Sequence, residues 1–302
     1  MDATTTPPIG AAPPAPAGPV VAARSERAQA RRETLTVLLR RPGFLFGLVV
    51  LLFWVVCAIL GERIAPYDPF NDFNVGHEPP SSTHLFGTDR LGRDVLSRVL
   101  VGARDVFIVA PAAAFIGVTA GTLLGLIMGY YHGIIDEVIS RIVEAFLSLP
   151  VILIALLTLV VLGSSTLVVI LVVGMLFTPI VARTVRSAVI GERQLDYVTA
   201  AKLRGENGPF IMFREIFPNI LPPIIVELTV RFGYAIFTVA TLSFLGVGIQ
   251  PPSPDWGLSV SEEYSNMIAG VWWPTIFPAL AIATTVVAVN LIADALASVT
   301  SE

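Results

Sequence analysis

Cysteine, histidine and lysine are scarce in this sequence of 302 residues, and each scarcity excludes a kind of chemistry. The single cysteine, Cys57, excludes an intrachain disulfide and gives no sign of the redox compartment. The histidines His77, His84 and His132 lack the paired spacing of a metal-binding motif. We therefore expect no metal site.

The only lysine, Lys202, is followed by Leu203. A phosphate-binding loop of the form GxxxxGK[ST] needs serine or threonine after its lysine, so this chain has no such loop. The sequence also lacks the nucleophile and base arrangements of a hydrolase. We expect that the chain is not an enzyme, with no catalytic residue and no cofactor of its own.

Charged residues are also few, at 14%, whereas hydrophobic residues make up 54% and the mean hydropathy is +0.77. A typical soluble domain carries about 25% charged residues. The net charge of -4 offers no basic surface for nucleic acid. We therefore expect a lipid bilayer to surround much of the chain.

Residues 1–40 differ in composition from the rest of the chain. Up to about residue 23 they are rich in alanine, proline and threonine, and arginines follow from Arg24 to Arg40. Such a segment buries too little apolar surface to offset the entropy of folding. We predict a disordered, basic cytoplasmic tail at 1–40 and a transmembrane domain at 41–302.

Six stretches are long and apolar enough to cross hydrocarbon, which predicts an all-α membrane protein of about six helices. They are Phe44–Leu60, Val106–Tyr130, Ile142–Leu162, Leu167–Val189, Leu221–Val247 and Pro274–Ala297. Arginines cluster before the first stretch and between residues 183 and 214, so the positive-inside rule predicts cytoplasmic termini. Loops 62–104 and 248–273 are then expected outside.

Small residues recur at every fourth position of the second stretch, at Ala113, Gly117, Gly121, Gly125, Gly129 and Gly133. Such a stripe lets another helix backbone approach closely. Glycine is also common in transmembrane helices in general, but so regular a row favours a packing face.

Ionisable residues within the predicted spans are few, and each is expensive to place in a membrane. They are Glu144, Glu227, Arg231 and Asp294. Glu227 and Arg231 are four residues apart and are predicted to pair on one helix face. We favour this structural pair over a proton relay, which needs a chain of groups across the bilayer.

The connection after the fourth span contains DYVTAAKLRG at 196–205. We predict a short helix that begins at an acidic residue and ends at a glycine, forming a compact projection for a partner's groove. Its candidate residues are Asp196, Tyr197, Thr199, Ala200, Ala201, Arg204 and Gly205. A solvated connecting helix is the alternative.

Two further segments have distinctive residues, HLFGTDRLGRDVLSR at 84–98 and LSFLGVGIQPPSPDWG at 242–257. In the first, the pairs Asp89/Arg93, Arg90/Asp94 and Asp94/Arg98 are each four residues apart and opposite in charge. This spacing predicts a short amphipathic helix from about Thr88, and a solvated, self-paired helix on the outer surface is the plain alternative. Its candidate residues are Gly87, Thr88, Asp89, Gly92, Arg93 and Asp94.

Together these segments resemble permease subunits of ATP-binding-cassette importers. Segment 196–205 is similar to the acid-Ala-Ala loop of such subunits, although Thr199 stands where the family often has glutamate and Glu215 where histidine is common. The other two segments resemble dipeptide and oligopeptide permeases of the DppC/OppC type, a group that includes nickel importers. The resemblance covers roughly residues 40–297.

The resemblance implies a type I permease fold for residues 41–302, in the plasma membrane of a prokaryote. It also implies a heterodimer with a second permease, two ATPase subunits or domains that bind ATP and Mg, and an external substrate-binding protein. The implied function is half of a peptide translocation pathway, coupled to ATP hydrolysis. Nickel or another small solute, a secondary transporter with paired inverted repeats, and a non-transporting scaffold are the alternatives.

Overall fold

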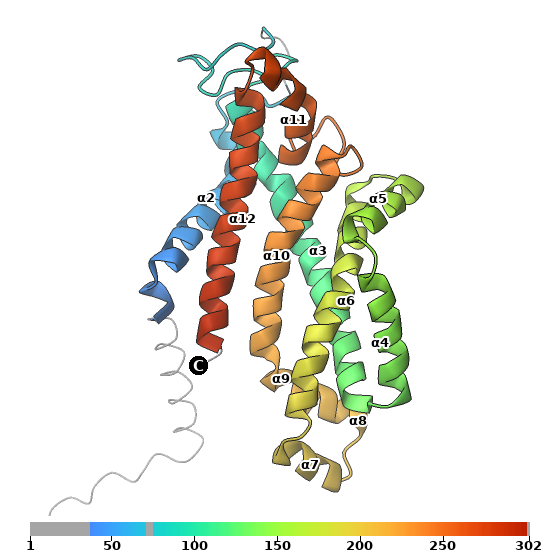
Figure 1. The fold of residues 1–302 in the computed structure, drawn as a ribbon. Helices are drawn as coiled ribbons and strands as arrows, with labels where there is room; N and C mark the ends of the chain where they lie inside the picture. The colour runs from blue at the N-terminus through green and yellow to red at the C-terminus, as the bar shows by residue number, and fades with distance from the viewer. Residues whose placement is uncertain (1–36, 71–74, 301–302) are drawn as a thin grey trace, which may run out of the picture.

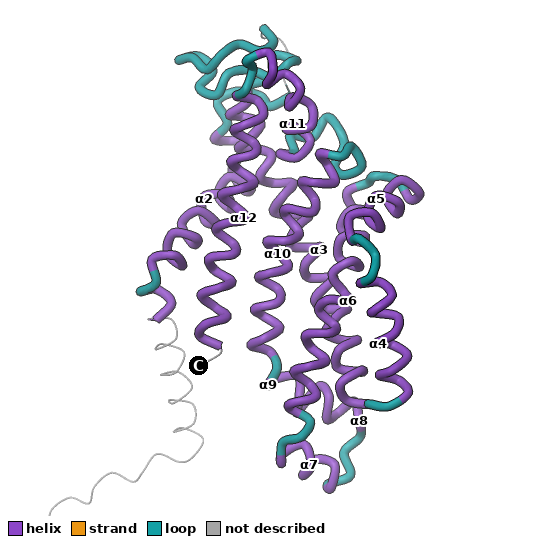
Figure 2. Tube along the Cα trace, viewed as in Figure 1, coloured by secondary structure: helices purple, strands orange, loops and turns teal. Residues whose placement is uncertain are grey.

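The computed structural model describes residues 37–70 and 75–300, and most of them are helical (Figure 1). The elements are α2 (Pro42–Ile64), α3 (Val95–Tyr131), α4 (Ile134–Leu147), α5 (Val151–Leu162), α6 (Thr166–Glu192), α7 (Asp196–Leu203), α8 (Gly208–Phe210), η1 (Ile211–Ile216), α9 (Phe217–Asn219), α10 (Leu221–Phe244), α11 (Trp256–Glu263), η2 (Tyr264–Ala269) and α12 (Trp273–Thr300). The described residues contain no β-strand (Figure 2). The all-α prediction is confirmed, while most of the predicted tail lies outside the described residues.

Five of the described helices, α2, α3, α6, α10 and α12, are long and apolar enough to cross a membrane. A sixth span forms if α4 and α5 are counted together, but they meet at an angle of 86°. Pro150 is the N-cap of α5, and a proline disfavours helical backbone at the residue before it, Leu149. The predicted span Ile142–Leu162 is therefore broken rather than continuous.

Helix α3 is the centre of the fold and packs closely on α6. A Cβ atom built on Gly117 would lie 2.6 Å from the carbonyl oxygen of Gly174, and one on Gly121 would lie 2.6 Å from Cβ of Val181. Gly125 and Gly129 face α6 at similar separations. The glycine row therefore lies where two backbones approach within one chain.

The row is shorter than the sequence pattern indicates. Gly133 lies beyond the end of α3 and has a φ of +73°, with no atom within 4 Å of a Cβ built on it. It serves the turn into α4, because glycine adopts this backbone conformation without the strain of a side chain. The same α4 is fastened to α6 by Asp136, which accepts two hydrogen bonds from Arg186, at 2.5 and 2.7 Å.

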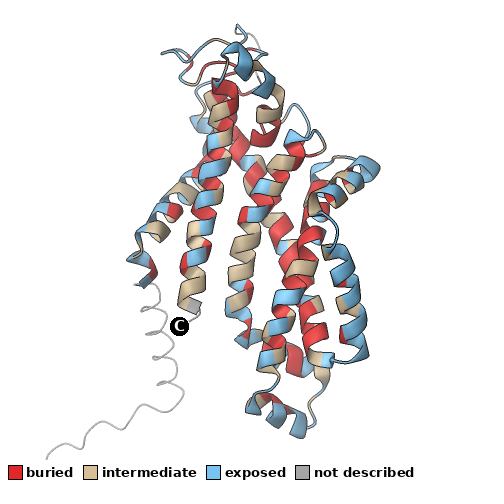
Figure 3. Ribbon diagram, in the orientation of Figure 1, coloured by how far each residue is buried: buried red, intermediate tan, exposed pale blue. Residues whose placement is uncertain are grey.

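Burial is uneven across the molecule (Figure 3). Helices α3 and α6 carry many buried residues, whereas α2, α4 and α5 expose apolar side chains along much of their length. An apolar hollow of about 530 Å³ opens between α4, α5 and α6. In a membrane such faces need lipid or another protein against them.

Figure 1 shows two clusters of loops and short helices at opposite ends of the bundle. The segment before α3, together with α11 and η2, gathers at the upper end, and α7, α8 and α9 gather at the lower end. The start of α2 and the end of α12 both lie toward the end that carries α7. We call the upper cluster, residues 66–70, 75–94 and 245–272, the cap, and the lower cluster, residues 193–220, the α7 loop.

Candidate functional site

The α7 loop is built around α7, whose inner face is buried. Val198 and Ala201 have no exposed surface and pack in a cluster with Ile211 and Ile216 of η1. Burying these side chains fixes the short helix against the ends of α6 and η1, because a helix of this length is not stable in isolation. The loop is therefore a rigid projection and not a loose connection.

The end of α7 is closed by a Schellman motif. The amide of Glu206 donates to the carbonyl of Ala201 at 3.3 Å, and the amide of Gly205 donates to that of Lys202 at 3.0 Å. Gly205 has a φ of +79°, the left-handed conformation that the motif requires and that glycine adopts most readily. This glycine ends the helix and turns the chain back toward α8.

Tyr197 joins α7 to its neighbours through its hydroxyl group. The hydroxyl donates to Oε1 of Glu192 at 3.1 Å and accepts a hydrogen bond from Nδ2 of Asn219 at 3.1 Å. Burial raises the pKa of this phenol above its ordinary value, so it stays protonated and able to donate. Tyr197 thus positions the loop relative to α6 and α9.

Glu215, which replaces the histidine common in the resembled family, accepts a hydrogen bond from Nη2 of Arg204 at 3.2 Å. Arg204 is about half exposed, so the pair is solvated and contributes little stability on its own. The pair directs the Arg204 side chain toward η1. Glu215, which departs from the family pattern, therefore has a hydrogen-bond partner nearby, Arg204.

The outer face of α7 carries Asp196, Thr199, Ala200 and Leu203, all exposed. Leu203 is 84% exposed, although a leucine at the tip of a loop gains nothing from contact with water. Leu203 is not among the residues that the sequence pattern predicts at a contact, although helix spacing from the buried Val198 and Ala201 places it on the opposite face. Ala201, expected at a partner contact, instead packs inward because it shares a face with Val198.

Segment 84–98 forms a turn before α3 and not the predicted helix. Thr88 and Asp94 form an antiparallel bridge, and Gly87 and Gly92 have φ values of +72° and +78°. Helix α3 begins only after Asp94, whose Oδ2 accepts a hydrogen bond from the amide of Ser97 at 2.8 Å. The two glycines impose turn geometry, which overrides the helical spacing of the charges.

Of the three predicted ion pairs, only Asp89 with Arg93 forms, at 2.6 Å between Oδ2 and Nε. Arg90 pairs with Glu262 at 3.5 Å, and Asp94 pairs with His84 at 2.9 Å. Arg98 pairs with Asp89 at 3.6 Å. The prediction of a helix here was wrong. The turn directs Arg90 and Arg93 toward α11, and it directs Asp94 toward His84.

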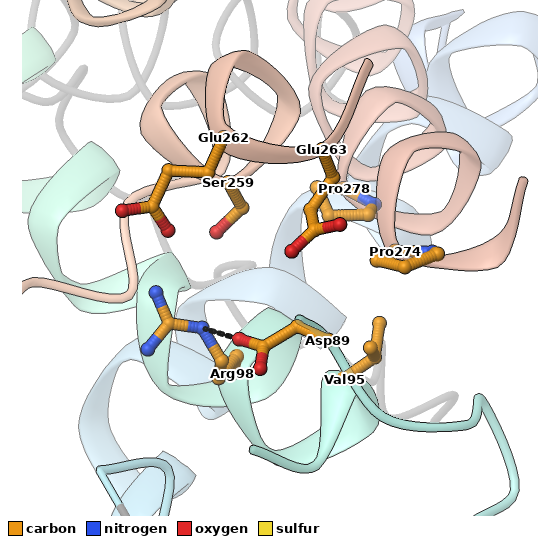
Figure 4. A pocket seen from close by; sticks show the side chains of 8 residues that line it. All are labelled: Asp89, Val95, Arg98, Ser259, Glu262, Glu263, Pro274 and Pro278. Atoms are coloured by element: carbon orange, nitrogen blue, oxygen red, sulfur yellow. Dashed lines mark ion pairs between the residues drawn. The ribbon is translucent and has the colours of Figure 1, made fainter. Parts of the chain in front are cut away.

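The charges of the cap form one largely buried network, of which Figure 4 shows Asp89, Arg98, Glu262 and Glu263. Arg93 bridges Asp89 and Glu262, the latter at 3.0 Å, and all three side chains are less than 15% exposed. Glu263 of α11 accepts hydrogen bonds from the amide of Arg90 at 2.9 Å and shares one with His77 at 3.0 Å. Segments more than 160 residues apart are thereby joined.

The cavity inside this network measures about 10 Å³. It is lined by Asp89, Val95, Arg98, Ser259, Glu262, Glu263, Pro274 and Pro278 (Figure 4). A space of this size holds about one water molecule. The network is therefore a structural joint, with no room for a transported solute.

Segment 242–257 leads from α10 into α11 and fixes the position of α11 in the cap. Ser243 Oγ accepts a hydrogen bond from the amide of Ile249 at 3.1 Å, and Trp256 is fully buried with its Nε1 donating to the carbonyl of Val99 at 2.9 Å. Asp255 caps α11 by accepting from the amide of Leu258 at 2.9 Å. Burial raises the pKa of Asp255 to about 6.

Comparison with known proteins agrees with this architecture. Residues 121–301 match the family described as "Binding-protein-dependent transport system inner membrane component", and residues 30–80 match the "N-terminal TM domain of oligopeptide transport permease C". The first match covers more than half of the chain. The class is therefore the membrane-spanning component of a binding-protein-dependent importer, and the chain belongs to this family of ATP-binding-cassette permeases.

Curated relatives resemble nearly the whole chain. The dipeptide transport system permease protein DppC of Escherichia coli K12 is 39% identical over 264 residues, 85% of this chain and 88% of that protein. The di/tripeptide permease DppC of Pseudomonas aeruginosa UCBPP-PA14 is 37% identical over 84% of this chain and 86% of its own length. The glutathione permease GsiD of Pectobacterium atrosepticum is 38% identical over 92% of both chains.

Proposed function

We propose that this chain is one transmembrane subunit of a peptide importer in the inner membrane of a bacterium. Its permease family and three relatives whose names specify dipeptides, di/tripeptides and glutathione support a peptide as the solute. A second, related permease completes the pathway as a heterodimer. Two ATPase subunits bind ATP and Mg, and an external binding protein delivers the peptide.

We propose that the α7 loop docks on an ATPase subunit. The observation that carries this proposal is the exposed Leu203 on a helix whose opposite face is packed and whose end is fixed by a Schellman motif. A rigid helix with an exposed apolar tip can fill a partner's groove without paying further ordering entropy. Its anchorage to α6 and η1 transmits the movement of the ATPase to the membrane helices.

We also propose the orientation in which both termini and α7 face the cytoplasm and the cap faces outward. The arginines before α2 and between residues 183 and 214 support it. The cap carries Glu262, Glu263 and Asp255 and presents the outer ends of α10 and α12. In this orientation the cap is the surface that meets the binding protein.

The test is a charge placed at the tip of α7. Leu203→Asp should leave the fold of this chain intact, because Leu203 is 84% exposed, but should weaken docking and lower receptor-stimulated ATP hydrolysis and peptide import by about tenfold or more. Leu203→Met, which keeps an apolar tip, is the matched control and should retain import. Wild-type import by the assembled Leu203→Asp complex would reject α7 as the coupling element.

A further inference from the structure

Two charged residues lie within the membrane-spanning helix α10, and Arg231 is near its middle. Glu227 and Arg231 follow the start of α10, Leu221, by six and ten residues, and the helix has 24 residues. At 1.5 Å per residue, Arg231 lies about 15 Å along a helix about 36 Å long. Neither residue is near enough to an end of α10 to reach water simply by extending along the helix.

The two residues pair, as their spacing predicts, but the pair leaves hydrogen-bonding capacity unused. Arg231 Nε donates to Glu227 Oε2 at 2.9 Å, and the guanidinium lies 5.2 Å from the ring centroid of Tyr234. Within the described part of the chain, Nη1 and Nη2 of Arg231 and Oε1 of Glu227 make no hydrogen bond. Both side chains are partly accessible, at 11% and 14%, and Tyr234 is 54% exposed.

The neighbouring part of α12 is polar as well. Asn290 and Asp294 are exposed there, and a Cβ built on Gly233 of α10 would lie 3.2 Å from Oδ1 of Asn290, so the two helices meet at this level. By contrast, the exposed residues of α2 between Leu45 and Leu60 are apolar, including Val56 and Ile59. Unused charged groups at this depth belong against water or a polar partner and not against lipid tails.

We propose that Glu227 and Arg231 bind the termini of the transported peptide as it crosses the membrane. This inference rests on the proposed function, which supplies a peptide and a water-filled pathway. The two free guanidinium nitrogens match a terminal carboxylate in bidentate geometry, and Oε1 of Glu227 accepts from a terminal ammonium. The paired groups meet at 2.9 Å, and a two-residue chain spans at most about 7 Å, so its two termini are close enough for each to reach one group of the pair.

The first experiment measures access to this face in the complete, reconstituted complex. In a Cys57→Ala background, Tyr234→Cys should react with a membrane-impermeant thiol reagent, and a saturating dipeptide with its binding protein should slow the reaction about tenfold. Val56→Cys on α2 is the matched control and should stay unreactive. An unreactive Tyr234→Cys in a complex that imports peptide would overturn the inference while leaving the proposed function intact.

The second experiment separates binding from structure. Arg231→Met and Glu227→Gln should each lower import of a free dipeptide about tenfold, with receptor-stimulated ATP hydrolysis retained, because the recognised charge is lost. The double variant Glu227→Gln/Arg231→Met leaves no unpaired charge. Recovery of wild-type import in the double variant would mean that the pair is only structural, whereas continued loss supports substrate binding.

Discussion

The cap and the α7 loop both connect membrane-spanning helices, yet they are held by different forces. In the cap, buried charges join segments that are distant in sequence, such as Arg93 with Glu262. In the α7 loop, apolar packing of Val198 and Ala201, one glycine turn and the hydrogen bonds of Tyr197 hold the chain. The comparison teaches that the cap depends on complete pairing of charges, whereas the loop depends on shape.

The difference also decides what local sequence patterns can reveal. Helix α7 begins and ends where its acidic residue and Gly205 predict, because its structure is set by neighbours in sequence. The charges at 89–98 are spaced for a helix, but their partners Glu262 and Glu263 come from α11. No pattern within the segment itself indicates partners so far along the chain.

The largest effect is expected from breaking the cap network. Asp89→Asn removes the carboxylate that faces both Arg93 and Arg98, leaving two buried guanidinium groups poorly compensated. Removing one partner of a buried pair typically costs about 3–5 kcal/mol. We expect a marked fall in yield and in the thermal unfolding temperature of the detergent-solubilised complex.

The control for this change lies in the same network. Arg90 is 49% exposed and pairs with Glu262 only at 3.5 Å, so Arg90→Gln should change stability by no more than about 1 kcal/mol. Equal losses in both variants would contradict the view that burial gives the cap its dependence on charge.

The next effect tests the connection between cap and loop, which runs through α3 and α6. Gly121→Leu places a side chain where even a Cβ would lie 2.6 Å from Val181, so the two helices must separate. Overpacking of this kind typically costs about 1–3 kcal/mol. We expect less assembled complex by size-exclusion chromatography, whereas Leu123→Ile on the exposed face should be tolerated.

A smaller and more specific effect is expected in the α7 loop. Gly205→Val should strain the left-handed residue by about 1–2 kcal/mol and tilt α7, lowering receptor-stimulated ATP hydrolysis while solute binding to the external protein is unchanged. Gly205→Asn, which tolerates this backbone conformation better, should lose less. Equal coupling in the valine variant and the wild type would show that the turn does not orient the loop.

Much of the fold follows from hydrophobic run lengths, because a bilayer requires continuous helices of a minimum length. The break between α4 and α5 does not follow from run length, since Ile142–Leu162 is apolar throughout its second half and only Pro150 marks the bend. The candidate site is predictable where its structure is set by residues close together in sequence, as are the two ends of α7. The burial of Ala201 and the exposure of Leu203 depend on η1, which no local pattern places beside α7.

The smallest expected effect is a change in the stability of the cap with pH, which arises from Asp255. Burial raises the pKa of Asp255 from 3.8 to about 6, so the folded cap binds this proton more tightly than the unfolded chain does. Stability from this group is fully present below pH 3.8 and is lost as the pH rises through about 6.

Asp255→Asn keeps a residue that can cap α11 but removes the titration. The difference in unfolding temperature between variant and wild type should therefore grow in favour of the variant between pH 5 and pH 7, about one unit on either side of that pKa of about 6. A difference that is constant across this range would mean that Asp255 stays ionised in the cap, with its charge satisfied by the amide of Leu258 and its neighbours.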